Sequence, residues 1–275
     1  MLVVDHTHCN LMIGGRRPAI FHDGIKLGRP DAIIPRIGAS VTSTGAAVIQ
    51  QFELMRVHTS LPTSALLLAR DKLKSLQLLA KHGIRIPLTL AVNSTWEIDR
   101  QLSIFKSFPV IVKLIEGTHG SGVTIAESYR SARSLLDTLL KLNGRILVQE
   151  YIAEAEGADV RAIVVGDRVV AAMRRQAGTG EFRSNLHLGA TSEVTELSDR
   201  ERDIAIKVTQ LMGLSMSGVD MLRSKRGPLV MEVNASPGLE GIETTTSADV
   251  AGAMLDQVER DWRKLRNFTR AAKSD

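Results

Sequence analysis

Apolar residues recur along the chain in two patterns, short strand-like runs and longer stretches at helical spacing. The strand-like runs lie at residues 1–5, 31–37, 108–114, 123–126 and 146–151, with a hairpin over 159–165 and 168–174. Helical spacing predicts helices over residues 43–55, 63–69, 71–82, 129–142, 201–212 and 251–268. The best candidate for a domain boundary lies around residues 62–70.

The stretch 217–238 is predicted to be a β-hairpin whose short loop contains Gly227 as a left-handed residue. Folding it about Arg226 places Asp220 directly opposite Glu232. Because side chains alternate along a strand, Asn234 shares their face. The other face is apolar and is predicted to lie in the core; it carries Val219, Met221, Leu229, Met231 and Val233.

Two adjacent carboxylates on a half-buried sheet repel each other, and a bound cation removes that cost. The side chains of Asp220, Glu232 and Asn234 offer only oxygen ligands, which suit Mg²⁺ or Mn²⁺ held together with substrate phosphates. The alternative is a solvated acidic edge in which Asn234 caps a turn.

Composition narrows the class of protein. The 275 residues contain 44% hydrophobic and 24% charged residues, which is ordinary for a globular protein. No apolar run reaches membrane-spanning length and no signal peptide is recognisable, so a cytoplasmic location is expected. Cys9 is the only cysteine, which excludes an intrachain disulfide. A net charge of +5 suggests an acidic partner, such as nucleotide phosphates, a nucleic acid or an acidic peptide.

Several other polar residues are candidates for chemistry. His6 and His8 could bind a metal, but no third ligand lies nearby in sequence, so a surface loop is expected. Lys113 ends an apolar strand and precedes the glycine-rich loop 116–122, an arrangement suited to a lid over a triphosphate. The alternatives are a lysine that reaches the surface and a simple turn.

Acidic and basic residues also follow one another near residues 150–161. Glu150 precedes Tyr151 at a strand end, and Asp159 and Arg161 share one side of the next strand. An acid there could accept hydrogen bonds from adenine or ribose, and Arg161 could reach a phosphate or a developing negative charge. The alternative is a pair of surface salt bridges.

Taken in order, these features resemble the ATP-grasp superfamily and, within it, the RimK family of ribosomal-protein glutamate ligases. The resemblance covers nearly the whole chain. The segments that carry it are AIIPRIG at 32–38, ARDKL at 69–73, VIVKLIEGTHGSGV at 110–123, LVQEYI at 147–152, FRSNLH at 182–187 and GPLVMEVNASPGLEGIE at 227–243.

The resemblance implies a role for each residue. Lys72 and Lys113 would bind the phosphates of ATP, and a lid containing Gly117, Gly120 and Gly122 would close over them. Glu150 and Tyr151 would bind adenine, and Asp159 would bind ribose. The nucleotide site would also be lined by Arg183, Ser184 and Asn185. Arg161 and Arg183 would be catalytic. The cofactor metal, expected to be two ions of Mg²⁺ or Mn²⁺, would be bound by Asp220, Glu232 and Asn234.

The implied fold is α+β: an ATP-grasp fold with a central domain at 63–152 and a C-terminal domain at 153–275, preceded by a partial α/β domain at 1–62. The implied activity is ATP-dependent addition of L-glutamate, through an acyl phosphate, to the acidic C-terminal tail of a ribosomal protein. Direct nucleic-acid or membrane binding is not expected, and a homo-oligomer is left open.

Two alternative functions remain at this point. One is a related ligase with a small-molecule or carrier acceptor, and the other is a non-catalytic nucleotide-binding regulator. The sequence also departs from the family at its start, because relatives begin with a βα unit before the strand that matches residues 2–5. We therefore expect an N-terminally truncated first domain and a start codon upstream of the assigned one.

Overall fold

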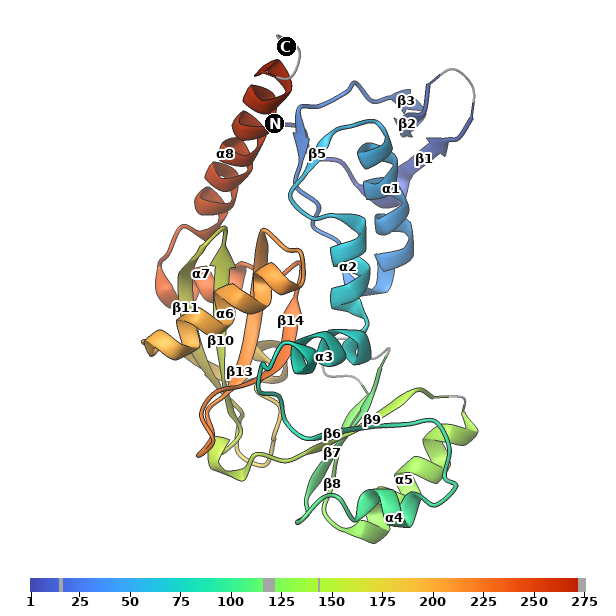
Figure 1. Cartoon of the computed structure of the whole chain (residues 1–275), viewed down its shortest axis with the longest axis vertical. Helices are drawn as coiled ribbons and strands as arrows, with labels where there is room; N and C mark the ends of the chain where they lie inside the picture. Colours follow the sequence, from blue (N-terminus) through green and yellow to red (C-terminus); the bar gives the residue numbers. More distant parts are fainter. Residues whose placement is uncertain (15–16, 116–121, 143, 272–275) are drawn as a thin grey trace.

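The structure is a computed structural model that describes residues 1–14, 17–115, 122–142 and 144–271 (Figure 1). Helices and strands are mixed along the chain, as expected for an α+β protein. The description proceeds through three groups of elements, each built around its own sheet.

The N-terminal group contains two small sheets and a helix. After the 3₁₀ turn η1 (His6–His8), strands β1 (Cys9–Met12), β2 (Ala19–His22) and β3 (Ile25–Lys26) form an antiparallel sheet. Strand β4 (Ala32–Ile33) pairs in parallel with β5 (His58–Thr59), and α1 (Thr42–Leu54), entered through η2 (Ala39–Val41), packs beside them. Ile20, Val48, Phe52 and Val57 form the core of this group.

The predicted strand at residues 1–5 is wrong. These residues have no strand partner, and Met1, Leu2 and Val3 are largely exposed. The predicted strand at 31–37 shortens to the two residues of β4. An apolar run predicts a strand only where a neighbouring strand can accept its hydrogen bonds, and none of the described residues does so here.

The central group is a four-stranded antiparallel sheet covered on one face. Its strand order is β6 (Thr89–Val92), β9 (Ile146–Glu150), β7 (Val110–Leu114) and β8 (Val123–Ala126). Helices α4 (Ile98–Leu102) and α5 (Tyr129–Lys141) cover it, burying Leu102 and Leu136 against Val110 and Val148. Ser128 begins α5 with a capping box, in which its hydroxyl accepts a hydrogen bond from Ser131 N.

The C-terminal group is a five-stranded antiparallel sheet. Its order is β12 (Thr191–Val194), β11 (Arg168–Gln176), β10 (Ala158–Val165), β13 (Met216–Leu222) and β14 (Leu229–Asn234). The short turns η3 (Ala153–Ala155) and η4 (Leu186–Leu188) lie in its connections. On one face, α6 (Asp199–Leu211), α2 (Thr63–Arg70) and α3 (Lys72–Lys81) pack on a continuous apolar core.

The opposite face of this sheet is divided into two halves. Helices α7 (Glu240–Thr246) and α8 (Val250–Ala271) cover one half, where Ile163, Met173 and Met254 are buried. The other half carries charged side chains of β10, β11, β13 and β14. Helix α3 lies between the two larger sheets, and Leu76 packs against Ile115 and Leu147 of the central group (Figure 1). The polar half therefore lies where the two larger groups meet.

The predicted pairing of Asp220 with Glu232 is confirmed, but the hairpin beyond it is irregular. A bulge shifts the register, so that Met221 pairs with Val230 and Met231 is left over. Val230 is consequently buried in the core, whereas Met231, predicted to be core, is only half-buried. Gly227 adopts φ +92° as expected, and the connection between β13 and β14 spans residues 223–228.

Candidate active site

A network of charged side chains occupies the polar half of the five-stranded sheet. Asp220 on β13 accepts two hydrogen bonds from Arg161 on β10, at 2.7 Å from Nε to Oδ1 and 2.6 Å from Nη2 to Oδ2. Arg175 on β11 reaches both acids: its Nη2 lies 3.1 Å from Asp220 Oδ2, and its Nε lies 2.7 Å from Asp159 Oδ1. Asp159, Arg175 and Asp220 are almost fully buried.

Burial and pairing set the pKa values of this network. Burial raises the pKa of Asp159, and Arg175 offsets only part of that effect. Burial also acts to raise the pKa of Asp220, but Arg161 and Arg175 together outweigh it, so the pKa of Asp220 is lowered. Of the two buried acids, Asp220 is therefore the more readily ionised.

Arg175 is a site residue that the sequence analysis missed. A regular hairpin about Gly166 and Asp167 would place Arg174 opposite Asp159. A bulge between Ile163 and Val164 moves the register by one residue, and Arg175 becomes the partner of Asp159. The strand pattern alone gives no sign of this bulge, so the sequence does not distinguish Arg175 from Arg174 as the partner of Asp159.

The proposed metal ligands share one face. Asp220 pairs with Glu232 across the hairpin, and Asn234 Nδ2 lies 3.3 Å from Asp220 Oδ2. Glu232 is exposed and makes no hydrogen bond or ion pair with any residue the structure describes. Rotating the Asn234 amide presents its oxygen instead of its nitrogen. The donor set therefore fits a hard divalent cation, provided that Asp220 is shared with or released by Arg161.

Two lysines face Glu232 across a small cleft. The cleft is lined by Lys72 from α3, Lys113 and Gln149 from the central sheet, and Met231 and Glu232 from β14. Lys113 Nζ donates to Gln149 Oε1 at 2.6 Å, and Lys72 Nζ donates to the Ile115 carbonyl at 3.3 Å. Burial lowers the pKa of both lysines, that of Lys113 to about 8. Gln149 holds Lys113 in place and was not identified from the sequence.

Two arginines, half-buried Arg70 and exposed Arg36, lie near the same region. Arg70 donates to the Ile37 carbonyl at 2.5 Å, and Arg36 donates to the Pro237 carbonyl. Desolvation lowers the pKa of both groups, and Glu232 partly restores that of Arg70. Together with the lysines they make this cleft strongly cationic.

Glu150 lies at the junction between the central sheet and the hairpin loop. Its Oε1 accepts hydrogen bonds from Leu88 N and from Arg226 Nη2, both at 2.6 Å. The adjacent Tyr151 is half-buried. The strand end expected to hold adenine is therefore tied to the loop between β13 and β14.

The segment around Arg183 lies beside Asp159. Arg183 forms an ion pair with Glu181, at 2.7 Å between Nη2 and Oε2, and its guanidinium lies 5.7 Å from the centre of the Phe182 ring. Ser184 contributes a hydrogen bond that lowers the pKa of Asp159, and Asn185 precedes η4.

Of the predicted lid, Gly117 and Gly120 lie outside the described residues, and the Gly122 carbonyl accepts a hydrogen bond from Leu114 N at 2.8 Å.

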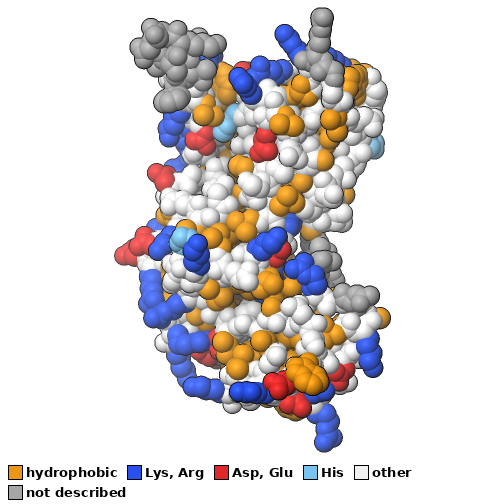
Figure 2. Space-filling model, turned by 45° about the vertical axis from the view of Figure 1, so that its right-hand side comes forward, with side chains coloured by type: hydrophobic (Ala, Val, Ile, Leu, Met, Phe, Trp, Pro, Cys, Tyr) orange, Lys and Arg blue, Asp and Glu red, His pale blue; other side chains and the backbone are white. Residues whose placement is uncertain are grey.

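The surface is rich in cationic side chains. Figure 2 shows lysines and arginines spread over one face of the molecule, several of them along one edge. No helix in the described part of the chain is both long and apolar enough to cross a membrane.

Comparison with known proteins identifies relatives over the whole chain. Residues 69–258 match the family model of the RimK-like ATP-grasp domain, and residues 1–66 match that of the RimK PreATP-grasp domain. A probable alpha-L-glutamate ligase of Chromohalobacter salexigens is 47% identical over 259 residues, which cover 94% of this chain and 86% of the relative. The protein of the same name from Vibrio cholerae is 47% identical over 268 residues, covering 98% and 89%.

Solved structures share the fold at lower identity. The ATP-grasp ligase PsnB complexed with minimal precursor superposes with a TM-score of 0.71 at 23% identity, covering 92% of this chain and 86% of that one. The D-alanine–D-alanine ligase from Bacillus anthracis gives a TM-score of 0.66 at 21% identity, covering 82% and 79%. These likenesses show an ATP-grasp fold with its preceding domain.

Proposed function

Because the chain belongs to the RimK family of ATP-grasp ligases, we propose that this ATP-dependent ligase adds L-glutamate to the C-terminal glutamate of a small-subunit ribosomal protein. The name shared by the relatives supports glutamate as the amine substrate. The cationic cleft supports an acidic acceptor.

The proposal rests on one observation: cationic and anionic side chains face each other across one cleft. Lys72 and Lys113 enter from α3 and the central sheet, while Glu232 enters from the hairpin that also bears Asp220 and Asn234. A triphosphate needs cationic side chains along its oxygens and a metal ion bridging them. The cleft combines both requirements.

In the proposed reaction, the acceptor carboxylate attacks the γ-phosphorus of ATP, and ADP leaves. The amino group of glutamate then attacks the acyl carbon, and phosphate departs as the amide forms. Lys72 and Lys113 hold the phosphate oxygens throughout, and Arg161 and Arg183 stabilise the negative charge that develops during transfer. Glu150 and Tyr151 bind adenine, Asp159 binds ribose, and Ser184 and Asn185 line the nucleotide site.

Asp220, Glu232 and Asn234 would hold Mg²⁺ or Mn²⁺, and the two carboxylates among these residues would allow two ions to be bound. When bound, the metal would neutralise part of the negative charge on the β- and γ-phosphates. A structure of PsnB complexed with Mg and ADP supports such a requirement in this fold. The domain limits 1–62, 63–152 and 153–275 remain our proposed division of the chain.

The proposal is tested by incubating the full chain with ATP, Mg²⁺, L-glutamate and an acidic peptide that ends in glutamate. We expect ADP release that depends on both substrates and a peptide heavier by one or more glutamyl residues. The matched control is the same peptide with an amidated C-terminus, which lacks the attacking carboxylate. ADP release without a mass increase in the peptide would instead favour a small-molecule or carrier acceptor.

The metal assignment has its own test. Asn234→Ala removes one ligand and one 3.3 Å hydrogen bond on the sheet surface. We expect turnover to fall by about 10- to 100-fold and the Mg²⁺ concentration for half-maximal activity to rise, while the free energy of unfolding changes by about 1 kcal/mol. Metal ligation would be contradicted if the variant lost activity while its Mg²⁺ concentration for half-maximal activity stayed the same as in the wild type.

A further inference from the structure

A second group of metal-binding side chains lies in the N-terminal domain, among residues that the proposed reaction does not use. One ligand atom each from His8, His22 and Asp23 lies within 4.8 Å of the others. We propose that these three residues form a site for a divalent transition-metal ion such as Zn²⁺. The proposal does not depend on the proposed function.

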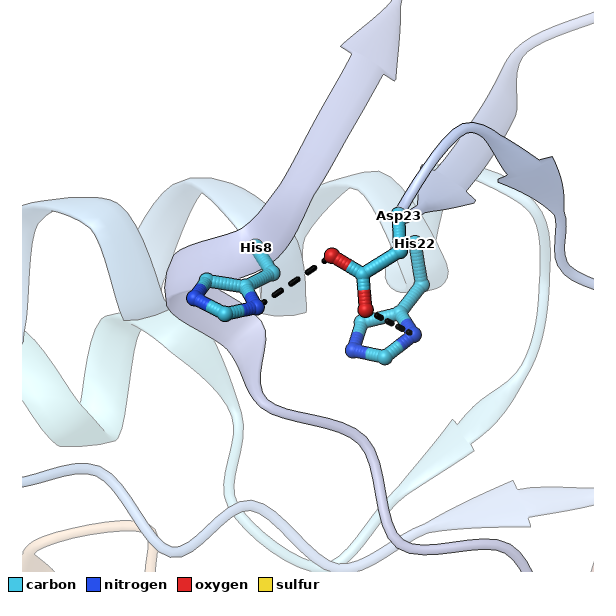
Figure 3. Close-up of side chains that lie close together, drawn as sticks. All are labelled: His8, His22 and Asp23. Atoms are coloured by element: carbon cyan, nitrogen blue, oxygen red, sulfur yellow. Dashed lines mark ion pairs between the residues drawn. The ribbon is translucent and has the colours of Figure 1, made fainter.

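The carboxylate of Asp23 lies between the two imidazole rings (Figure 3). His8 Nδ1 is 3.2 Å from Oδ1, and His22 Nδ1 is 3.6 Å from Oδ2. Zinc binds histidine nitrogen and carboxylate oxygen at about 2.0–2.2 Å, which places neighbouring tetrahedral ligands about 3.3–3.5 Å apart. The two nitrogen–oxygen distances involve different oxygens of the carboxylate, and both are close to that separation, so Asp23 already lies at ligand distance from each imidazole.

Paired backbone segments hold the three residues in position. Strand pairing sets His22 opposite Cys9, the residue that follows His8. Asp23 N donates to the His8 carbonyl at 3.4 Å. Asp23 and Gly24 adopt φ +49° and +79°, which forms the tight turn between β2 and β3 and holds the carboxylate beside both rings. The site is therefore built on a hairpin rather than on a free loop.

Exposure and donor type favour a transition metal over the magnesium of the active site. The side chains of His8 and Asp23 are 59% and 62% exposed, so an ion can enter and retain water in its open position. His22 Nε2 is buried and has no hydrogen-bond partner among the described residues, which leaves Nδ1, already facing Asp23, as the available nitrogen. Two imidazoles and one carboxylate suit Zn²⁺, Cu²⁺ or Ni²⁺, whereas Mg²⁺ prefers oxygen ligands.

The sequence analysis considered His6 and His8 and found no third ligand. The fold brings two further ligands to His8 through the β1–β2 pairing: His22 and Asp23, which lie 14 and 15 positions after it in the sequence. A bound ion would cross-link η1, the end of β2 and the β2–β3 turn. These elements belong to the group with the shortest strands in the described chain.

The experiment is a Zn²⁺ titration of the full chain against a chromophoric chelator, with Mg²⁺ in excess to occupy the active site. We expect one Zn²⁺ per chain. Asp23→Asn, His8→Gln and His22→Gln should each weaken binding by about ten-fold or more. Asparagine tolerates the left-handed conformation at position 23, so the turn is preserved in that variant. His82→Gln, at an exposed histidine beyond α3, is the matched control and should bind as wild type.

Four results would overturn the proposal. The first is the absence of stoichiometric Zn²⁺ binding, and the second is unchanged affinity in the three ligand variants, which would leave ordinary ion pairs between Asp23 and its histidines. The third is loss of the bound Zn²⁺ in Glu232→Gln, which would place the ion in the active site. A thiolate charge-transfer band with Co²⁺ would also overturn the donor set, because it would identify Cys9 as a ligand.

Discussion

Arg175 and Asp159 form a buried ion pair on adjacent strands, with Nε 2.7 Å from Oδ1 and Nη2 in contact with Oδ2. The same guanidinium also reaches Asp220. One arginine therefore compensates two acids that are buried side by side, and Arg161 supplies the second positive charge.

Removing Arg175 should destabilise the protein severely. In Arg175→Met, Asp159 loses its ion-pair partner while it remains buried, and we expect the free energy of unfolding to fall by about 3–5 kcal/mol in urea denaturation. Arg174→Met is the matched control, because Arg174 pairs with exposed Glu193 and should contribute about 1 kcal/mol or less. Equal losses in the two variants would show that the buried network does not determine stability.

ATP affinity should depend on the protonation of Lys113. Its pKa of about 8 results from burial, is raised in part by Glu232 and is lowered further by Lys72. Below pH 8 the lysine is charged and binds phosphate. Above pH 8 the free protein must take up a proton to bind ATP, so Kd should rise by up to about ten-fold per pH unit. Titration calorimetry at pH 7, 8 and 9 measures this.

Lys113→Arg provides the control for that pH dependence, because arginine stays charged throughout the range. Its Kd for ATP should be flat from pH 7 to 9. A rise in Kd of the same steepness in this variant would assign the dependence to another group.

Activity on an acidic peptide should fall as salt is added. Attraction between the basic chain and an acidic acceptor is screened beyond about 10 Å at 0.1 M ionic strength. The sequence offers Arg16, Arg17, Arg36 and Arg174 as acceptor contacts. Arg16 lies outside the described residues and Arg17 is exposed, whereas Arg174 is paired with Glu193.

Among these, Arg36 is the strongest candidate, because its side chain is exposed and contacts the Pro237 carbonyl, which follows the strand of the proposed metal ligands. We expect Arg36→Ala to lower kcat/KM for the peptide by about ten-fold with little change in the Kd for ATP. Arg174→Ala should change both by less than about two-fold. A kcat/KM that is independent of ionic strength for an acidic peptide would count against electrostatic capture.

The N-terminal group should open before the five-stranded sheet. Strands β3, β4 and β5 contain two residues each, and residues 1–3 are exposed. We expect amides in residues 1–14 and 17–38 to exchange roughly 100-fold faster than those of β10 and β13. Mass-spectrometric hydrogen exchange measures this, and equal protection of the two regions would contradict it.

The sequence predicted what depends on local pattern. The helices of residues 42–54, 129–141 and 199–211 follow from their apolar spacing, and the pairing of Asp220 with Glu232 follows from alternation about one turn. Both inferences use only residues that lie within a short stretch of the sequence.

The sequence did not predict what depends on bulges and long-range pairing. The bulge between β13 and β14 buries Val230 in the core, where Met231 was predicted. The bulge between β10 and β11 makes Arg175, rather than Arg174, the partner of Asp159. His8 similarly meets His22 and Asp23 only through strand pairing. A single extra residue inverts every side chain beyond it, and no local signal marked either bulge.

The contact between Glu150 and Arg226 has a mechanical consequence. It joins the end of a central-sheet strand to the loop of the β13–β14 hairpin, and the Arg85 side chain reaches the Arg226 carbonyl from the same side. Rocking of the central sheet would therefore pull on the loop that precedes Glu232 and Asn234. Glu150 would thus couple movement at the proposed adenine-binding strand end to the position of the proposed cation ligands.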